Sequence, residues 1–397
     1  MAVRDPVVIQ SVTRFAPLEG QLRPAWAEID LGAIRHNAAV LAAEVHPARL
    51  CAVVKAAGYG HGAPEVARAA LEGGADWLAV ALVEEGRELR AAGIDAPVLV
   101  LSEPAPSAMD EVVELSLTPT LYTPAGLDAI RSAVRASRIG RPFSVHIKVD
   151  TGMHRVGAPP PAAVALALEA GASPELHLGG FWTHFAVSDE VADPYTSEQV
   201  DRFQQALDGL AAGGVRPALR HAANSGGAIW HPDSRFDMVR CGIALYGLSP
   251  GADGTSRHPV PLLRPAMAVK ARVSFVKTVP AGERLSYGLR YRLARDSVVA
   301  TVPLGYADGV TRSLSATGGM VLIAGQRVPI AGTVTMDQVL VDCGPDSRVA
   351  VGDEVVLLGR QGDEEITAWE WAERTGSIAY EVVCGISGRV PRSYLGA

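Results

Sequence analysis

Short apolar runs alternate with alanine-rich amphipathic segments over the first 250 residues. The runs predict strands at residues 27–30, 50–56, 77–82, 97–101, 118–122, 144–150, 180–184, 219–223 and 238–246. Between them, helical spacing predicts helices after residue 30 and at 63–71, 84–92, 124–136 and 197–212. Roughly eight such units favour a (β/α)8 barrel. An open doubly wound sheet is the alternative, although no glycine-rich dinucleotide fingerprint follows the first strand.

The pattern changes after residue 248. Residues 249–254 are a cluster of turn formers and are expected to form a linker. Beyond it, short β-branched segments separated by Gly and Pro predict strands at 266–279, 297–302, 320–323, 328–330 and 354–358. A chain of 397 residues also exceeds the usual size of one core. We therefore expect a flexible extension at 1–23, a barrel at 24–250 and a mainly-β domain at 258–397.

Composition and charge exclude several classes of protein. With 48% apolar and 20% charged residues the chain is typical of a globular enzyme, and a net charge of −7 gives no reason to expect nucleic acid or a membrane as partner. Neither a signal peptide nor a spanning apolar segment is visible. The four cysteines are far apart and form no CxxC pair, so we expect no metal site, no disulfide framework, and a reducing cytoplasmic location.

One lysine stands out as a candidate for covalent chemistry. Only four of the 36 basic residues are lysines, and Lys55 lies at the end of an apolar run, just before a glycine-rich turn. Arginine can replace lysine as a solvated charge but cannot form a Schiff base. A lysine retained at this position therefore favours imine chemistry. The alternative is a lysine whose ammonium group reaches solvent past the end of the strand.

Other polar residues also fall at predicted strand ends, where barrel enzymes place their active sites. They are Lys148, Asp150, His184, Asn224 and Ser225, with Arg240 at the start of the last apolar run. Taken singly, His184 could be a core histidine and Arg240 an ion-pair partner. The glycines at 226, 227 and 242 would expose backbone N–H groups to a phosphate. A phosphate site and an imine-forming lysine together indicate pyridoxal phosphate (PLP), with Schiff-base aldolase barrels as the alternative.

The chain also resembles a known family, the alanine racemases, which are PLP enzymes of fold type III. The likeness runs from about residue 26 to residue 392. The matching segments are 27–31, 52–62, 148–155, 183–185, 224–225, 239–247, 286–288, 305–309, 336–338 and 379–381. This resemblance implies an isomerase that interconverts L- and D-alanine and supplies D-alanine for peptidoglycan.

The resemblance also implies a mechanism with two bases. Lys55 would carry PLP and serve as one base, and Tyr287 would be the other, since racemisation needs a proton to leave one face of the α-carbon and return to the other. His184 would contact Tyr287 and Arg240. Arg240 would face the pyridine nitrogen of PLP, where the related amino-acid decarboxylases carry an acidic residue.

The remaining site residues follow from the same resemblance. The phosphate would be bound by Tyr59, Asn224, Ser225, Gly242, Ile243 and Tyr380. The substrate would be held by Arg155 and the backbone N–H of Met336, with Tyr306 and Asp337 beside it. Lys148 would be carbamylated to orient Arg155, or would form an ordinary ion pair. The family is dimeric, so a homodimer with shared sites is expected.

Two departures from the family pattern are visible. Ala57 stands where Asn or Asp is usual, and residues 333–335 replace a Gly-Arg-Val/Ile run. Three other functions stay open: a racemase for serine or for larger or basic amino acids, a PLP carrier without turnover, and a barrel without PLP that uses Asp150 and His184 in hydrolysis. Carriers of this fold type are single barrels, and the predicted second domain argues against that reading.

Overall fold

The computed structural model describes residues 22–251 and 262–396, which form two compact units. One unit comprises Leu31–Arg264; the other joins the chain up to Asp30 with the chain from Pro265. The expected extension at 1–23 lies almost entirely outside the described residues, as does part of the expected linker at 249–254. Arg23, at the end of that extension, donates to the buried carboxylate of Asp308 at 2.8 Å.

The first unit is built on a sheet of eight parallel strands. In sheet order the strands are β8 (Leu219–His221), β7 (Leu176–Trp182), β6 (Phe143–Lys148), β5 (Thr118–Leu121), β4 (Val98–Val100), β3 (Trp77–Val80), β2 (Arg49–Val53) and β9 (Met238–Cys241). The two end strands are joined by hydrogen bonds from Asp237 N–H to Arg220 O and from Arg240 N–H to Ala223 O, both 3.0 Å. The sheet therefore curls into a near-closed barrel, which confirms the predicted fold class.

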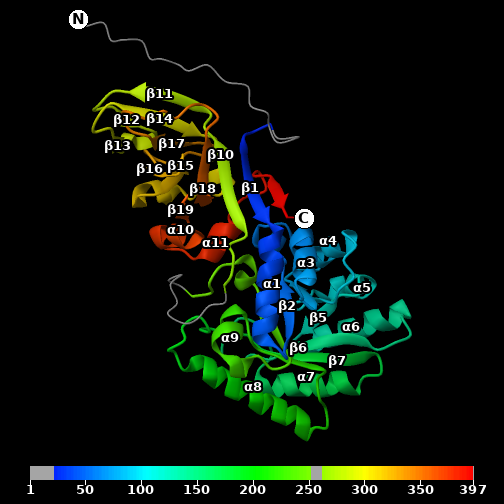
Figure 1. Cartoon of the computed structure of the whole chain (residues 1–397). Helices are drawn as coiled ribbons and strands as arrows, with labels where there is room; N and C mark the ends of the chain where they lie inside the picture. Colours follow the sequence, from blue (N-terminus) through cyan, green and yellow to red (C-terminus); the bar gives the residue numbers. More distant parts are fainter. Residues whose placement is uncertain (1–21, 252–261, 397) are drawn as a thin grey trace, which may run out of the picture. The chain divides into compact units, whose positions relative to one another are not determined.

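Helices follow the strands and surround them (Figure 1). They are α1 (Leu31–Val45), α3 (Ala63–Glu72), α4 (Val83–Ala91), α5 (Met109–Glu114), α6 (Pro124–Ser137), α7 (Pro160–Ala172), α8 (Tyr195–Ala212) and α9 (Ser225–Trp230). Their apolar faces explain this placement: Ile34, Ala38 and Leu41 of α1 are fully buried at the expected helical spacing. The predicted helices agree with these bounds to within two residues.

The described residues of the second unit form three sheets. The largest has the order β16 (Gln326–Pro329), β15 (Met320–Ile323), β18 (Glu354–Gln361), β10 (Met267–Arg272), β1 (Ala25–Asp30) and β20 (Arg392–Leu395), and β19 (Glu364–Ile366) pairs with β18. The second joins β11 (Phe275–Val279), β14 (Ser297–Val302) and β17 (Val339–Asp342), and the third joins β12 (Arg284–Leu285) and β13 (Tyr291–Arg292). Two helices, α10 (Ala368–Thr375) and α11 (Ala379–Cys384), complete this mainly-β unit.

One predicted strand forms in an unexpected place. Residues 27–30 lie in β1, but this strand pairs with β10 and β20 rather than with the barrel. Its placement as the first barrel strand was therefore wrong, and the eight later strands complete the barrel without it. Another long run, 266–279, splits into β10 and β11.

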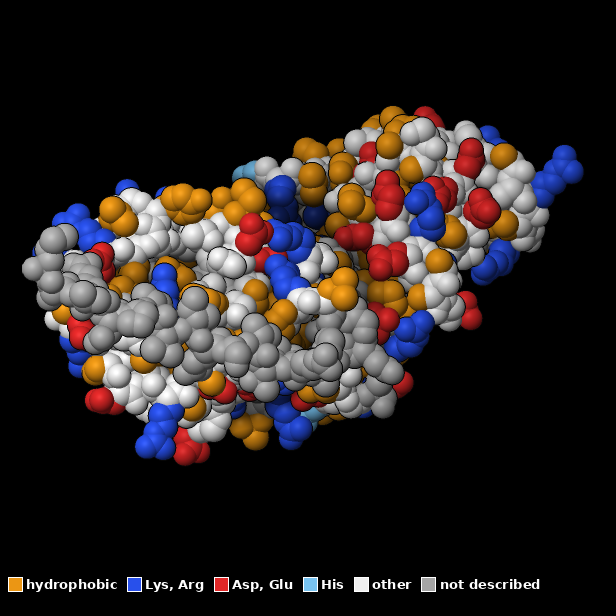
Figure 2. Space-filling view, turned by 90° about the horizontal axis from the view of Figure 1, so that it is seen from above, with side chains coloured by type: hydrophobic (Ala, Val, Ile, Leu, Met, Phe, Trp, Pro, Cys, Tyr) orange, Lys and Arg blue, Asp and Glu red, His pale blue; other side chains and the backbone are white. Residues whose placement is uncertain are grey.

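Three further features of the molecule concern its surface charge, the length of its helices and its potential metal ligands. On the face shown in Figure 2, acidic and basic side chains lie among one another. Among the described residues, no helix combines the length and apolarity needed to cross a bilayer, and no group of three or more His, Cys, Asp or Glu side chains is arranged to hold a metal ion.

Candidate active site

Lys55 follows strand β2 and opens an unusual left-handed turn. Residues Ala56 to Tyr59 all have φ between 51° and 61°. The turn is closed by the Gly58 N–H, which donates to Val54 O at 2.9 Å, and by the Ala56 N–H, which donates to Glu85 Oε1 at 2.6 Å. Lys55 is half-buried at the carboxyl end of the barrel, two residues beyond the strand rather than inside it as expected. A left-handed turn at this point reverses the chain over a few residues and brings Tyr59 back to the barrel.

Tyr59 lies beside the backbone that follows strand β9. Its ring stacks on Tyr246, with centroids 4.8 Å apart. A Cβ atom on Gly242 would come within 2.4 Å of the Tyr59 hydroxyl oxygen, so a larger residue at 242 would displace the Tyr59 ring. The Gly242 N–H donates to Ser225 Oγ at 3.0 Å, and the Ala244 N–H reaches the same oxygen at 3.4 Å. Two strand ends and the turn after Lys55 thus bring their polar groups to one place.

Asn224 orders the start of helix α9 in the same region. Its side-chain oxygen accepts from Gly227 N–H at 2.9 Å and from Ser188 Oγ at 2.7 Å. Ile243 is buried next to Gly242. The hydroxyl groups of Tyr59 and Ser225 and the backbone around Gly242 are the donor set that a phosphate monoester requires. The barrel residues expected to bind phosphate therefore converge and fit such a group.

Arg240 organises the interior of the barrel beside this region. Its Nη2 donates to the carbonyl oxygens of Thr183 and Ala222 at 2.8 and 2.9 Å and lies 3.2 Å from His184 Nδ1. Its Nη1 lies 3.0 Å from His221 Nδ1. The guanidinium is buried, and burial lowers its pKa to about 10, so it stays charged at neutral pH. Among the described residues, no hydrogen bond uses its Nε–H, which leaves a donor for an acceptor such as a pyridine nitrogen.

The charge of Arg240 fixes the protonation of both histidines. An arginine only donates, so His184 Nδ1 and His221 Nδ1 must accept. Burial and the Arg240 charge lower the pKa of each ring well below its usual value, so both are neutral. A neutral imidazole that accepts at Nδ1 carries its proton on Nε2. His184 therefore presents an Nε2–H donor rather than an acceptor.

Lys148 ends strand β6 and is almost completely buried. Its Nζ lies 4.3 Å from the centre of the Trp182 ring. The Cζ atom of Arg240 lies 4.4 Å from the centre of the Trp182 ring as well. Burial, with the nearby charges of Arg240 and Arg155, lowers the pKa of Lys148 to about 7. A large fraction of Lys148 is thus an uncharged, nucleophilic amine at neutral pH. Arg155 itself is exposed at the same end of the barrel.

Three further residues join this network, and the sequence analysis missed them. Trp182 lies under both cations, His221 accepts from Arg240, and His146 lies 3.0 Å from His221. His146 and Lys148 are two residues apart on one strand, so they point to the same side. This spacing is the sequence signal that could have identified His146. A titratable residue two positions before a lysine at a strand end points, like that lysine, into the barrel.

The other expected site residues lie on the second unit. Tyr287, Tyr306 and Met336 are 74%, 42% and 53% exposed, although all three are large and apolar. Asp337 is exposed and accepts from Arg389 at 2.8 Å, while Tyr380 is half-buried in α11. The structure thus divides the expected site residues between the two units.

Three loops of that unit are tied together by hydrogen bonds. Thr333 Oγ1 donates to Tyr287 O at 2.8 Å, and Ser286 Oγ donates to Thr333 O at 2.6 Å. Tyr306 N–H donates to Thr335 O at 2.9 Å. Tyr287, Tyr306 and Met336 therefore belong to one surface, which we call the aromatic loop surface.

Comparison with known proteins decides the family. The model "Alanine racemase, N-terminal domain" matches residues 29–250, and "Alanine racemase, C-terminal domain" matches residues 266–394. The chain belongs to the alanine racemase family. These enzymes are PLP-dependent isomerases that interconvert L- and D-alanine.

Individual alanine racemases agree over nearly the whole chain. The protein of Symbiobacterium thermophilum is 50% identical over 375 residues, which cover 94% of this chain and 98% of the relative. The crystal structure from D-cycloserine-producing Streptomyces lavendulae has a TM-score of 0.88 and 41% identity, covering 95% and 98% of the two chains. The Bacillus anthracis alanine racemase with bound L-Ala-P has a TM-score of 0.86 and 38% identity, covering 94% and 96%.

Proposed function

We propose that this protein racemises alanine with PLP bound at the carboxyl end of its barrel. The observation that carries the proposal is the convergence of Lys55 with a phosphate-compatible cradle formed by Tyr59, Ser225 and Gly242. An amine that can form a Schiff base and a phosphate site on one barrel edge are what PLP requires. When bound, PLP draws electrons from the substrate α-carbon and so makes its proton acidic.

The barrel residues would divide the binding of PLP among them. Tyr59, Ser225 and the N–H groups of Gly242 and Ile243 would hold the phosphate, with Asn224 fixing the start of α9 and Tyr380 contributing from α11. Arg240 would direct its Nε–H at the pyridine nitrogen. Because its two terminal nitrogens already contact two carbonyl oxygens and two histidine rings, its orientation is set before any ligand arrives.

Lys55 and Tyr287 would move the α-proton on opposite faces of the substrate. For Tyr287 to accept a proton, its phenolate form must be stabilised. The His184 Nε2–H is a donor suited to a phenolate oxygen, because Arg240 occupies Nδ1. Arg240 would therefore tune Tyr287 through His184.

Substrate orientation would rest on charge at the barrel edge. Arg155 would bind the substrate carboxylate together with the Met336 N–H, beside Tyr306 and Asp337. Lys148, with its low pKa, would react with carbon dioxide to form a carbamate next to Arg155. The neutral amine would release a proton in this reaction, and the negative charge of the carbamate would attract the Arg155 guanidinium.

We further propose a homodimer in which the aromatic loop surface of one copy completes the barrel site of the other. The exposure of Tyr287, Tyr306 and Met336 supports this, because such a patch is usually covered by a partner. Free thiols at all four described cysteines fit a reducing cytoplasm, where D-alanine enters peptidoglycan synthesis.

The test is to load the protein with PLP, record its visible spectrum and compare rates across L-amino acids. We expect fast racemisation of L-alanine and at least tenfold slower turnover of L-serine and L-lysine. Equal or faster turnover of serine or lysine would replace the alanine assignment with a broader racemase of the same fold. A spectrum with bound PLP but no α-proton exchange on any amino acid would instead favour a carrier.

A further inference from the structure

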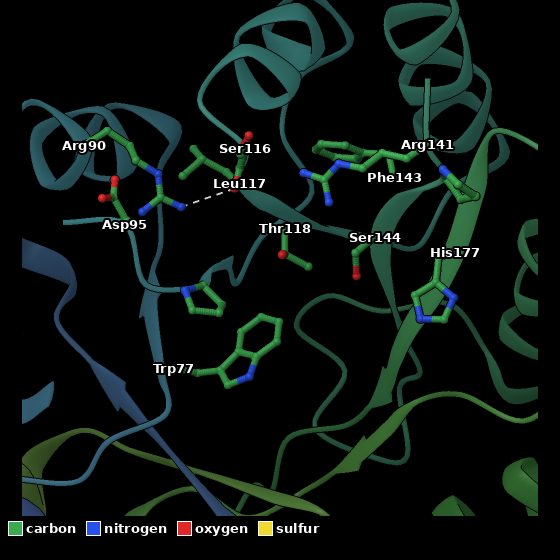
Figure 3. A pocket seen from close by; sticks show the side chains of 12 residues that line it. Trp77, Arg90, Asp95, Ser116, Leu117, Thr118, Arg141, Phe143, Ser144 and His177 are labelled. Atoms are coloured by element: carbon green, nitrogen blue, oxygen red, sulfur yellow. Dashed lines mark hydrogen bonds between the residues drawn. The ribbon is translucent and has the colours of Figure 1, made fainter. Parts of the chain in front are cut away.

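A cavity lies at the opposite end of the barrel from Lys55. It has a volume of about 540 Å³, within the range of small-molecule sites. Trp77, Thr118, Phe143 and Ser144, at the first or second positions of β3, β5 and β6, line it, and so does His177 of β7. Figure 3 shows Trp77, Thr118, Ser144 and His177 around one common space. The amino-terminal ends of parallel strands carry no residue of the proposed alanine site, so this cavity is separate from it.

The wall of the cavity is positively charged. The Arg90 guanidinium donates hydrogen bonds to backbone carbonyl oxygens, including those of Leu115 at 2.9 Å and Ile94 at 2.6 Å. Figure 3 shows its hydrogen bond to the carbonyl oxygen of Ser116. These contacts fix the guanidinium without neutralising it. Among the described residues, neither Arg90 nor Arg141 forms an ion pair, and the single carboxylate in the lining is the exposed Asp95.

A buried donor without a partner lies behind this wall. Arg240 donates to His221 Nδ1, so the neutral His221 ring carries its proton on Nε2. That N–H in turn donates to His146 Nδ1 at 3.0 Å. His146 must then carry its own proton on Nε2, and this atom is buried with no partner in the described structure. Its ring lies 5.5 Å from that of Trp77. A Cβ on Gly179 would lie 2.1 Å from Ser144 Oγ and 3.3 Å from His146 Nε2, so a side chain at 179 would crowd both polar groups.

We propose that this cavity binds a small organic anion with a flat apolar body, of the aromatic carboxylate class. Arg141 would hold the anionic group together with the hydroxyls of Thr118 and Ser144, since a free guanidinium binds carboxylates through paired hydrogen bonds. Trp77 and Phe143 would pack against the flat body. The site shares its inner wall with the His146–His221–Arg240 chain, whose far end is the proposed PLP site. The inference does not depend on the reaction performed there.

The probe is benzoate, titrated calorimetrically into the full-length protein. Because Arg155 is a second place where a carboxylate could bind, the titration is done in an Arg155→Ala background. We expect one site per chain, an affinity at least tenfold lower in Arg141→Gln, and a smaller loss in Arg141→Lys, which keeps the charge but not the paired geometry. Arg138→Gln, an exposed arginine three residues away that does not line the cavity, is the matched control and should bind as the parent does.

Benzyl alcohol separates charge recognition from apolar packing. The proposal predicts that it binds at least tenfold more weakly than benzoate. It is overturned if benzoate does not bind, if Arg141→Gln binds it as well as Arg138→Gln does, or if benzyl alcohol binds equally well. None of these outcomes alters the racemase proposal, which is measured separately by α-proton exchange.

Discussion

At the scale of single residues, the barrel interior is governed by Arg240. Its guanidinium fixes the tautomers of two histidines and contributes to the low pKa of Lys148. The sequence identified Arg240, His184 and Lys148 from their strand-end positions and the family resemblance. It did not reveal that His221 and His146 continue the network, because which ring meets which depends on strand stagger around the barrel.

Lys148 predicts a pH dependence of stability. Its pKa is about 7 in the folded protein and near 10.5 when exposed, so between these values the unfolded chain binds the extra proton. Stability should therefore rise with pH from about 7 to 10.5 and fall as pH decreases across that window. Lys148→Met should remove a slope worth a few kcal/mol, measured by urea unfolding in CO2-free buffer.

The variant Lys277→Met is the control, because Lys277 on β11 is only half-buried, and the slope should persist in this variant. An unchanged slope in Lys148→Met would show that this lysine is not the group responsible.

The left-handed backbone conformation of Ala57 should cost a measurable amount of stability. The residue is exposed at φ 52°, a conformation that Asn and Asp tolerate better than Ala. Ala57→Asn should raise the free energy of unfolding by roughly 0.5–1 kcal/mol, whereas the β-branched Ala57→Val should lower it by about 1 kcal/mol or more. Equal stability of the two variants in urea would argue against a left-handed backbone here.

At the scale of elements, the local sequence pattern predicted where helices and strands form better than it predicted which strands pair with one another. Helices such as α6 and strands such as β14 formed within one or two residues of their predicted bounds, because amphipathic spacing and β-branching are local properties. Strand β1 was misplaced because its partners, β10 and β20, lie more than 230 residues away in sequence. The left-handed turn after Lys55 was also missed, since alanines rarely adopt it.

Residues 333–335, which differ from the family pattern, include a side chain that connects two loops. Thr333 fixes the backbone of Tyr287, so Thr333→Val should loosen that loop without touching the core. We expect kcat to fall by roughly three- to tenfold with a change in unfolding free energy of about 1 kcal/mol or less. Thr317→Val, which removes a hydroxyl bonded only within its own turn, should leave kcat unchanged. Equal kcat values for the two variants would remove Thr333 from this role.

At the scale of the whole molecule, the proposed site residues are divided between two units. Fold class, barrel and β-rich second unit followed from the sequence, because alternating β/α units and a later change of period are distributed over hundreds of residues. The sharing of sites between copies followed only from the resemblance, since no pattern in the β segments marks an interface.

Shared sites predict complementation between inactive variants. Lys55→Ala and Tyr287→Phe should each be nearly inactive as homodimers. Mixed under conditions that exchange subunits, up to half of the molecules become heterodimers with one intact site, so activity should rise to roughly a quarter of the parent value. Mixing Lys55→Ala with Lys55→Met is the control and should recover nothing. Lack of recovery despite proven exchange would place both bases in one chain.

The central claim is that Lys55 and Tyr287 move the α-proton of alanine between two faces. The direct measurement follows L-alanine in deuterated buffer, recording deuterium at the α-carbon and optical rotation together on the PLP-loaded protein. The account predicts that the parent protein incorporates deuterium while the optical rotation falls to zero. In Lys55→Ala neither deuterium incorporation nor a change in rotation should occur. Deuterium incorporation with full retention of rotation would contradict it, because a single base would then return the proton to the face it left.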